Sequence, residues 1–448
     1  MIERQRAFFR TRRTFSLSFR LKQLDVLRRA VAEREEDLYA ALDEDLGKSR
    51  LEAYTSETGF VLSDIDHAAR NLRFWMRPER RSTPLIARPG KSRVVPRPYG
   101  TILITGPWNY PFQLLFSPLT GAIAAGNCVC LKPSEYAPAV SRLIGELIGE
   151  NFAPEYINVV EGDAETARNL LEQRFDYIFF TGSSRVGKEV MVSAARHLTP
   201  VTLELGGKCP CIVCEDADLG VTARRIMRGK LLNAGQTCVA PDYVLADESV
   251  FEALLAELEN ACRSYEGRVS GRIINRAHFD RIAAYLKQGR ILCGGETDPG
   301  KLRISPSILV DVDFESPVMQ EEIFGPVLPV LRFKTLEDVF KQLDNRPSPL
   351  ALYVFSGKRS AAREIIDRTS SGGVCINDTV THIMGKHLPL GGVGESGMGS
   401  YRGRATYDTF THYRSVLERG TWIDFPFGYP EKTVSQGFIK RIYGFLMG

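Results

Sequence analysis

Apolar residues recur at every third or fourth position through much of the first 75 residues, which is the spacing of one face of an amphipathic helix. This pattern is carried by Leu21, Leu24, Leu27, Val31, Leu38 and Leu42. Five arginines among the first 13 residues are typical of a transit peptide, but Glu3 interrupts them and the helical pattern continues. We therefore predict that residues 1–75 are helices that belong to the fold.

Residues 77–99 have a different character, because prolines and basic side chains replace the helical pattern. Within sheets, proline is largely confined to edges, so we expect extended edge structure here. The segment is either a linker or an arm that reaches another domain or subunit.

From residue 100 onward, short apolar runs alternate with helical patterns. The apolar runs lie at 100–107, 127–134, 157–160, 177–182 and 243–246, and the helical patterns at 139–151, 217–232, 249–264 and 278–289. Such alternation predicts an α/β fold with parallel strands covered by helices. Ligands bind at the carboxyl ends of such strands. Asn109, Lys132 and Gly182 all follow predicted strands, which makes them candidates for a binding site.

The composition is that of an ordinary soluble protein, with 44% hydrophobic and 25% charged residues, and 448 residues make about two or three domains. A net charge of +4 does not indicate a nucleic-acid-binding surface. No segment reaches the roughly 18 consecutive apolar residues of a membrane span. Nine cysteines, an odd number, favour reduced thiols and a cytoplasmic location.

Three cysteines, Cys209, Cys211 and Cys214, stand close enough together to suggest a metal site. No second cluster follows and no histidine lies within ten residues, whereas structural zinc sites take four ligands. We expect these small residues to fill a strand, and we expect no metal.

Cys238 is the cysteine whose neighbours suit a nucleophile, because Gly235, Gln236 and Thr237 are small or polar. A helical run precedes the loop, and Pro241 prevents a regular helix after it. A thiol at such a position can be stabilised as a thiolate by backbone N–H groups. The alternative is a small buried hydrophobic side chain.

Glu204 stands inside an apolar strand and is followed by two glycines. A buried carboxylate is costly unless it has a partner or a function, and burial raises its pKa toward the range of a general base. Pairing with a buried lysine or arginine is the alternative.

A possible anion site follows the strand at 177–182, where Gly182, Ser183 and Gly187 open a helix whose free N–H groups could take a pyrophosphate. The motif alone is weak, since glycine turns are common there. Lys132, followed by Glu135, could meet a ribose or phosphate; the alternative is a solvated side chain.

Seven motifs in order resemble those of the NAD(P)-dependent aldehyde dehydrogenase superfamily, most closely its class 3 or fatty-aldehyde branch. The motifs are Pro107–Pro111, Leu131–Glu135, Phe180–Ser183, Leu203–Lys208, Gly235–Cys238, Glu322–Pro326 and Pro389–Gly394. The resemblance covers nearly the whole chain. The segment from Ser400-Tyr401 to His412, together with the short N-terminus, favours that branch.

The resemblance implies roles for ten residues. Cys238 would be the nucleophile, Glu204 the general base and Asn109 the side-chain donor of the oxyanion hole. The cofactor residues would be Lys132 and Glu135 at the adenosine ribose, Gly182, Ser183 and Gly187 at the pyrophosphate, and Glu322 and Phe324 at the nicotinamide ribose and ring. An aldehyde would be oxidised to its acid through a Cys238 thiohemiacetal and thioester, with water activated by Glu204. Because Glu135 suits a free 2′-hydroxyl, NAD is expected, with NADP as a second possibility.

The family fold implies a Rossmann-like NAD(P)-binding domain at 1–78 and 99–204 and an α/β catalytic domain at 205–388. Residues 79–98 and 389–448 would form a small β-rich oligomerisation arm and a C-terminal tail. By analogy with this branch we expect a homodimer. The stretch from Gln436 to Met447 is too short to span a bilayer, but its basic and apolar residues could touch a membrane or cap the cleft.

Three other functions are considered. A CoA-acylating aldehyde dehydrogenase would resolve the same thioester with a thiol, although Glu204 favours water. A non-enzymatic structural or binding protein would need none of Cys238, Glu204 and Asn109. A cysteine hydrolase lacks a base histidine, since the six histidines are scattered without a supporting motif. The resemblance suggests medium- or long-chain aliphatic or aromatic aldehydes, with Tyr110, Leu114 and the 379–388 loop as candidates for the pocket.

Overall fold

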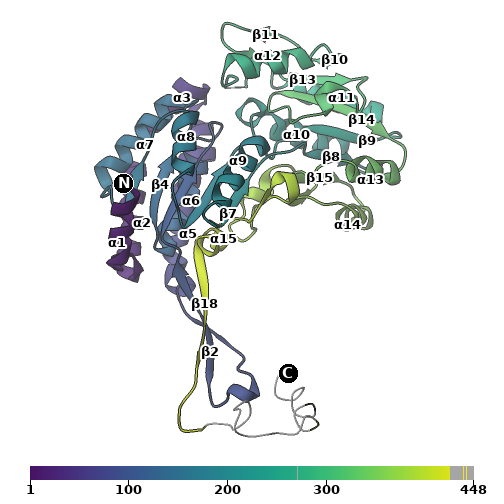
Figure 1. The fold of residues 1–448 in the computed structure, drawn as a ribbon. Coiled ribbons are helices and arrows are strands. Elements are labelled where there is room, and N and C mark those ends of the chain that lie inside the picture. The colour runs from purple at the N-terminus through teal and green to yellow at the C-terminus, as the bar shows by residue number, and fades with distance from the viewer. Residues whose placement is uncertain (270, 424–436, 438–439, 441–448) are drawn as a thin grey trace.

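The computed structural model describes residues 1–269, 271–423, 437 and 440, and in these residues the chain forms two α/β lobes and a projecting arm (Figure 1). Each lobe is built on its own mostly parallel sheet. The predicted α/β fold is confirmed.

The sheet of the first lobe has six strands in the order β17-β7-β6-β3-β4-β5. The strands are Thr101–Thr105 (β3), Cys128–Lys132 (β4), Ile157–Val159 (β5), Tyr177–Thr181 (β6), Val201–Glu204 (β7) and Gly397–Met398 (β17). All neighbours pair in parallel except β17, which runs antiparallel to β7. The strand order reverses between β3 and β6, and ligands bind at the carboxyl edge of such a reversal.

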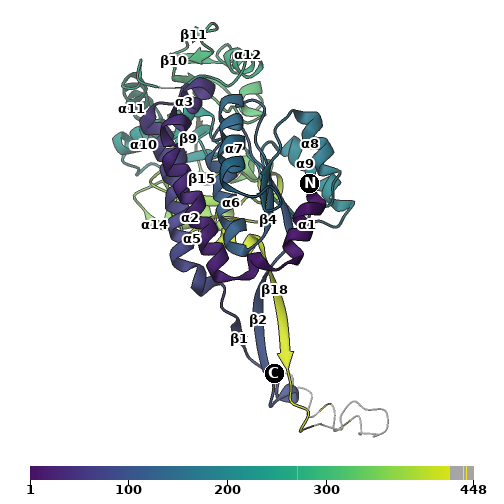
Figure 2. The same ribbon diagram turned by 90° about the vertical axis from the view of Figure 1, so that its left-hand side faces the viewer.

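Helices cover both faces of this sheet, with α2, α5, α6 and α7 on one side and α1, α8 and α9 on the other (Figure 2). Their bounds are Ile2–Arg10 (α1), Leu17–Glu33 (α2), Gly59–Trp75 (α5), Gln113–Ala125 (α6), Pro138–Asn151 (α7), Ala164–Leu171 (α8) and Ser184–Ala195 (α9). Between α2 and α5 lie Glu35–Leu46 (α3), Arg50–Ala53 (α4) and a π-helical turn, Tyr54–Thr58 (η2). The predicted helical character of 1–75 is confirmed up to Trp75.

The sheet of the second lobe has seven strands in the order β10-β13-β14-β9-β8-β15-β16. They are Pro210–Val213 (β8), Tyr243–Asp247 (β9), Arg290–Cys293 (β10), Ser307–Val310 (β13), Val327–Phe333 (β14), Ala351–Phe355 (β15) and Gly373–Ile376 (β16). The helices of this lobe are Leu219–Leu231 (α10), Phe251–Arg263 (α11), Arg276–Tyr285 (α12), Leu336–Asp344 (α13) and Arg359–Arg368 (α14). A small hairpin, Thr297–Asp298 (β11) and Arg303–Ile304 (β12), lies beside them. The chain passes between the lobes from β7 to β8, and returns between β16 and β17.

The segment 77–99 is extended, as predicted, and contains Glu79–Arg81 (β1) and Lys91–Pro98 (β2). The strand β2 pairs with β1 on one side and with Thr411–Glu418 (β18) on the other, which makes the three-stranded antiparallel sheet of the arm. Residues 397–409 depart from the predicted boundary, because β17 belongs to the first sheet and Arg404–Thr409 (α15) contacts α6. A strand of two residues beside a glycine-rich loop has no hydrophobic periodicity from which its sheet could be predicted.

No helix among the described residues is long and apolar enough to cross a membrane. The predicted contact of the C-terminal tail with a membrane or the cleft concerns Gln436 to Met447, most of which lies outside the described residues.

Candidate active site

The loop that carries Cys238 is shaped by three consecutive residues with positive φ, Asn233 (51°), Ala234 (52°) and Gly235 (81°). They end α10 abruptly and turn the chain. A side chain on Gly235 would place its Cβ 2.2 Å from the carbonyl oxygen of Gly325, so only glycine fits. Seven of the nine cysteines are buried, whereas Cys238 and Cys375 are partly exposed. Cys238 as a residue therefore keeps some exposed surface.

Asn109 reaches the Cys238 loop from the first lobe. It follows β3, is 3% exposed, and donates from Nδ2 to the carbonyl oxygen of Gln236 at 2.9 Å. The next residue repeats this contact between lobes, because the Tyr110 and Thr237 hydroxyls lie 2.6 Å apart. The predicted oxyanion donor thus contacts the loop of the predicted nucleophile, at a residue 127 positions further along the chain.

Glu204 ends β7, where its carbonyl oxygen accepts the Gly182 N–H at 3.0 Å. The side chain is 3% exposed, and neither carboxylate oxygen has a hydrogen-bond partner among the described residues. Burial raises the pKa of Glu204 well above its ordinary value, and the buried Arg402 opposes that rise. The structure therefore does not support the alternative of a Glu204 hydrogen-bonded to a lysine or arginine. An unpartnered buried carboxylate is what a general base requires.

The electrostatics around Cys238 differ from the expectation of a stabilised thiolate. Burial, followed by the carboxylates of Glu322 and Glu204, raises the pKa of the thiol to about 12, while its backbone contact and Arg402 lower it. Burial and the two carboxylates therefore favour the neutral form of this thiol. The dependence of this pKa on both carboxylates also shows that Cys238, Glu204 and Glu322 share one small region.

Lys132 and Glu135 lie at the end of β4. The ammonium group of Lys132 is buried, donates to the Pro133 carbonyl oxygen at 2.8 Å and lies 3.7 Å from the Glu135 carboxylate. Burial lowers the pKa of Lys132, and the nearby Glu135 carboxylate partly opposes that shift. The alternative of a solvated lysine is therefore wrong for this side chain. Neither residue has a contact with the Cys238 loop in the described part of the chain.

The turn after β6 opens α9 with Ser183 as its N-cap, where Oγ accepts the Val186 N–H at 3.4 Å. Gly187 lies in the first turns of α9, where a Cβ would come 2.7 Å from the Leu205 side chain. Helix and strand therefore pack closely, and the positive end of α9 faces the carboxyl edge of the sheet.

Glu322 and Phe324 belong to a loop of the second lobe. The Phe324 ring packs edge-on against Trp108 of the first lobe, with ring centroids 5.3 Å apart. Burial and the nearby Asp242 raise the pKa of Glu322 to about 8. A Cβ on Gly206 would lie 2.3 Å from a Glu322 carboxylate oxygen.

A cavity of about 390 Å³ lies between the two lobes, lined among others by Ser184, Glu395, Gly206 and Glu322. It combines the start of α9, a glycine pair that leaves room beside Glu322, and titratable groups. Pyrophosphate on helix N–H groups and ribose on carboxylates are the interactions that a dinucleotide needs. The residues present therefore fit an NAD-type cofactor.

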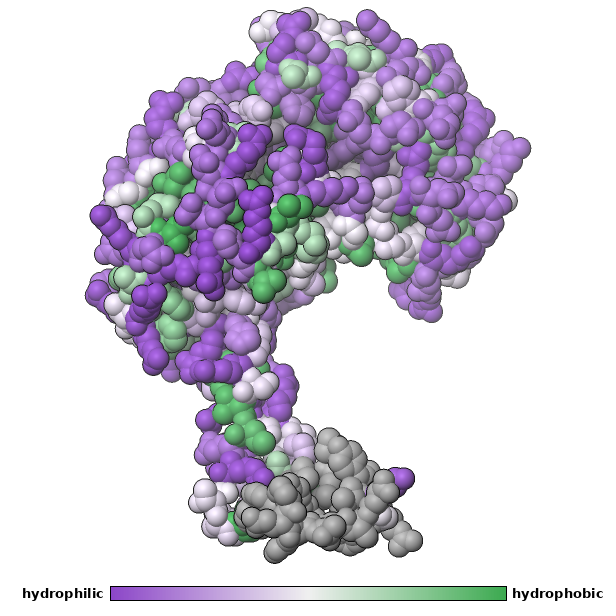
Figure 3. Space-filling view, viewed as in Figure 1, coloured by the Kyte–Doolittle hydropathy of each residue, from purple (hydrophilic) through white to green (hydrophobic). Residues whose placement is uncertain are grey.

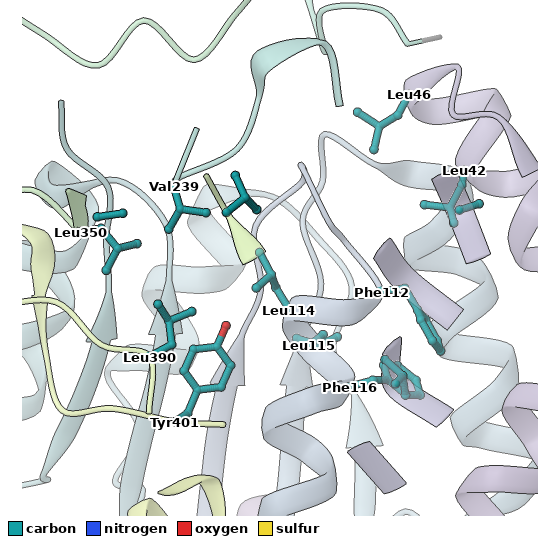
Figure 4. Close-up of a cluster of buried hydrophobic side chains, with 14 of the residues drawn as sticks. Leu42, Leu46, Phe112, Leu114, Leu115, Phe116, Val239, Leu350, Leu390 and Tyr401 are labelled. Carbon is teal, nitrogen blue, oxygen red and sulfur yellow. The ribbon is translucent and has the colours of Figure 1, made fainter. Parts of the chain in front are cut away.

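Apolar side chains from both lobes gather in one buried cluster (Figure 4). Leu114, Val239, Leu390 and Tyr401 are buried and belong to one hydrophobic cluster. In Figure 4 the Tyr401 hydroxyl points away from its own segment, toward the side where Leu114 and Val239 lie. Cys238 and Glu204 both act on the pKa of this phenol, which burial raises most strongly, so the ring lies close to the reacting groups.

Four polar residues around the site were missed by the sequence prediction. Arg402 is buried, has a φ of 96°, and its guanidinium stands 4.2 Å over the Phe60 ring. Lys48 and Asn233 donate to the Asn109 carbonyl oxygen, and Glu57 accepts the N–H of Phe112, three residues further on. A charged residue inside a helical segment was the available signal for Glu57, whereas Lys48 follows the Gly47 C-cap of α3 in a short loop and has no such signal. Within the described residues, no group of three potential metal ligands occurs.

Known proteins show close similarity over the whole chain. A model of the aldehyde dehydrogenase family matches residues 1–416. The 4,4'-diaponeurosporen-aldehyde dehydrogenase of Staphylococcus aureus is 46% identical over 427 residues, covering 94% of this chain and 93% of that protein. A dimeric NADP-preferring aldehyde dehydrogenase of Canis lupus familiaris is 43% identical, with 94% of each chain covered.

The solved substrate-bound structure of a Staphylococcus aureus AldH superposes with a TM-score of 0.95 and 44% identity, over 99% of this chain and 98% of that one. Related proteins use either NAD or NADP. Both the sequence match and the fold extend far beyond the site itself. The chain therefore belongs to the aldehyde dehydrogenase family, and it is an oxidoreductase that acts on aldehydes.

Proposed function

We propose that this protein oxidises an aldehyde to its carboxylic acid with NAD⁺ or NADP⁺ through a covalent thioester on Cys238. The observation that carries the proposal is the meeting of the Asn109 amide with the Cys238 loop at Gln236. A partly exposed thiol, an amide donor from the opposite lobe and an unpartnered carboxylate are the three groups that this chemistry requires.

In the first half of the reaction, the Cys238 thiol gives its proton to solvent and its sulfur forms a bond to the carbonyl carbon of the aldehyde, while the π electrons of the carbonyl move to the oxygen. The negative charge that develops on the oxygen is met by the Asn109 amide and the backbone N–H of Cys238. One donor of this kind contributes about 10²–10³ in rate. Collapse of the adduct releases a hydride with its electron pair and leaves a thioester; when bound, the nicotinamide supplies the acceptor for that hydride.

In the second half, Glu204 takes a proton from water, which attacks the thioester carbon. The carbon–sulfur bond breaks, the acid leaves and Cys238 regains its proton. A general base contributes about 10²–10⁴. Because both Glu204 oxygens are unpartnered in the described structure, they are free to orient water. This favours water over CoA as the acyl acceptor.

The cofactor would be held by residues of both lobes. Lys132 and Glu135 would bind the adenosine ribose, and Gly182, Ser183 and Gly187 would shape the pyrophosphate site. Glu322 and Phe324 would contact the nicotinamide ribose and ring. A carboxylate at Glu135 repels a 2′-phosphate, so NAD is the preferred cofactor and NADP the weaker one.

The substrate would carry an apolar tail. Leu114, Val239, Leu390 and Tyr401 form a buried apolar cluster beside the Cys238 loop, which would make the surroundings of the substrate apolar. We therefore propose medium- or long-chain aliphatic or aromatic aldehydes. The Staphylococcus aureus relative is named for its action on 4,4'-diaponeurosporen-aldehyde.

The arm would pair two copies of this chain. Figure 3 shows it standing clear of the body, with apolar side chains where it leaves the lobes. The outer edges of β1 and β18 have no neighbouring strand in the described part of the chain. A relative is named as dimeric, so we propose a homodimer, and we propose a cytoplasmic location.

The direct test is a panel of aldehydes, with hexanal as the simplest, assayed for NADH and NADPH formation in parallel and with CoA present or absent. Oxidation with NAD that does not depend on CoA supports the proposal. A strict need for CoA would replace water as the acceptor, and no oxidation of any aldehyde would refute the proposed function.

A further inference from the structure

The side chain of Asn109 has little freedom if it is to meet an oxygen atom in a transition state, because an oxyanion donor works only at about 2.7–3.1 Å from that oxygen. One of its two amide hydrogens is already used on the Gln236 carbonyl oxygen. The other hydrogen is available to a reacting group. Its direction depends on where the backbone of Asn109 is placed.

Two side chains hold that backbone by donating to the same carbonyl oxygen. The Asn109 carbonyl oxygen accepts from Lys48 Nζ at 2.9 Å and from Asn233 Nδ2 at 2.7 Å. Asn233 also lies 3.2 Å from the Gln236 carbonyl oxygen, the same acceptor that Asn109 uses. A single amide therefore links the backbone of Asn109 to the loop that carries Cys238.

The residues just after Asn109 are held by Glu57. One Glu57 oxygen accepts the N–H groups of Phe112 at 3.2 Å and of Gln113 at 2.7 Å. The other oxygen pairs with Lys48 Nζ at 2.5 Å. Lys48 thus bridges Glu57 and the Asn109 carbonyl, and the chain from 109 to 113 is fastened at both ends.

This ion pair is costly in its position. Both side chains have no exposed surface, and Glu57 lies in the π-helical turn η2, an element that often occurs at functional sites. Buried ion pairs commonly contribute less to stability than apolar residues of similar volume. Lys48 and Glu57 use their remaining hydrogen bonds on the backbone at 109 and at 112–113. We therefore explain the pair by the position it imposes on this backbone and not by its contribution to stability.

We propose that Lys48, Glu57 and Asn233 are positioning residues of the oxyanion hole, which hold the Asn109 backbone so that its amide points at the aldehyde oxygen. They act through Asn109 and touch neither substrate nor cofactor. This inference rests on the role proposed for Asn109 above. It concerns the first half of the reaction, in which the aldehyde oxygen becomes charged.

The test is the rate of the first turnover of NADH, measured by stopped flow with hexanal and saturating NAD. The double variant Lys48→Met, Glu57→Gln removes the donor to the Asn109 carbonyl without leaving one buried charge alone, and keeps an acceptor for the N–H groups of Phe112 and Gln113. Asn233→Gly is the second variant, because glycine tolerates the positive φ at this position. Each variant is made with Asn109 intact and with Asn109→Ala.

With Asn109 intact, each variant should slow the first turnover by about 10- to 100-fold, the cost of a small misplacement in an active site. With Asn109→Ala, the same changes should slow it less than about threefold, because a positioning residue has nothing left to position. The KM for NAD should be unchanged. Equal losses in both backgrounds, or no loss when Asn109 is intact, would overturn the inference.

Arg20→Met is the matched control. Arg20 is a buried cation that donates to the carbonyl oxygens of Thr14 and Ala124, far along α6 from Asn109. It should lower the melting temperature without slowing the first turnover. If Asn109→Ala alone left the rate unchanged, the proposed role of Asn109 would fail, and this inference with it. If the double variant did not fold, Asn233→Gly would decide alone.

Discussion

The side-chain amide of Asn109 donates to the carbonyl oxygen of Gln236 at 2.9 Å, which ties a loop of one lobe to the loop of the nucleophile in the other. This contact places the reaction at the junction of two sheets. The first lobe contributes the Asn109 amide and the second lobe the Cys238 thiol, and the proposed reaction needs both. The predictions below separate the roles of these groups.

Cys238→Ala should abolish NADH formation, because the other thiol beside this loop, that of Cys209, is fully buried. The measurement is steady-state NADH production with hexanal. Cys375→Ala is the matched control, since Cys375 is the other cysteine with partial exposure in the described chain, and it should retain activity. Substantial turnover by Cys238→Ala would remove Cys238 as the nucleophile.

Glu204→Gln should allow one burst of NADH for each active site and then stall, because the thioester would form but water would not be activated. The steady rate should fall by about 10²–10⁴. Stopped-flow absorbance separates the burst from the steady phase, and mass spectrometry should detect the acylated chain. Unchanged steady turnover would assign the base to another group.

Arg402→Met should move the acidic limb of the kcat profile to higher pH. Glu204 works as a base only when ionised, so activity rises with pH through its pKa, and the Arg402 cation lowers that pKa. Removing the cation raises the pKa further, and the rate at neutral pH falls. Arg402→Lys keeps the charge and should shift the limb much less. Identical profiles for both variants would argue against an electrostatic role.

Alkylation of Cys238 by iodoacetamide should be slow in the absence of cofactor and should accelerate about tenfold per pH unit between roughly pH 7 and 9. The reason is that burial and two carboxylates raise the pKa of the thiol to about 12. Glu204→Gln removes one of these carboxylates, lowers the pKa and should increase the rate. The experiment uses Cys375→Ala protein, with labelling followed by mass spectrometry. A rate independent of pH would show that the thiol is already ionised.

Glu135→Gln should improve the use of NADP relative to NAD by several-fold. The carboxylate of Glu135 would repel a 2′-phosphate, whereas a neutral amide can donate to it. The measurement is the ratio of kcat/KM for the two cofactors. Glu165→Gln, an exposed change on α8, is the control and should leave the ratio unchanged. An unaltered ratio in Glu135→Gln would place the cofactor ribose elsewhere.

Strands and helices with a strong hydrophobic periodicity were predictable from the sequence. The strands at 177–182 and 243–246 and the helices at 139–151 and 249–264 correspond to β6, β9, α7 and α11, because buried strands and amphipathic helices have local patterns. The place of β17 was not predictable, since two residues pair with β7 only after some 190 residues of chain have folded between them.

The sequence by itself determined the order of strands and helices, the motifs around Cys238 and Glu204, and the membership of the family. Each of these depends on residues that are adjacent in the sequence. Only the tertiary structure decided which charges face one another. Lys48, Glu57 and Arg402 reach the site through contacts between helices and loops that no local pattern records. The raised pKa of Cys238 has the same origin, since burial and the approach of distant carboxylates exist only in the folded chain.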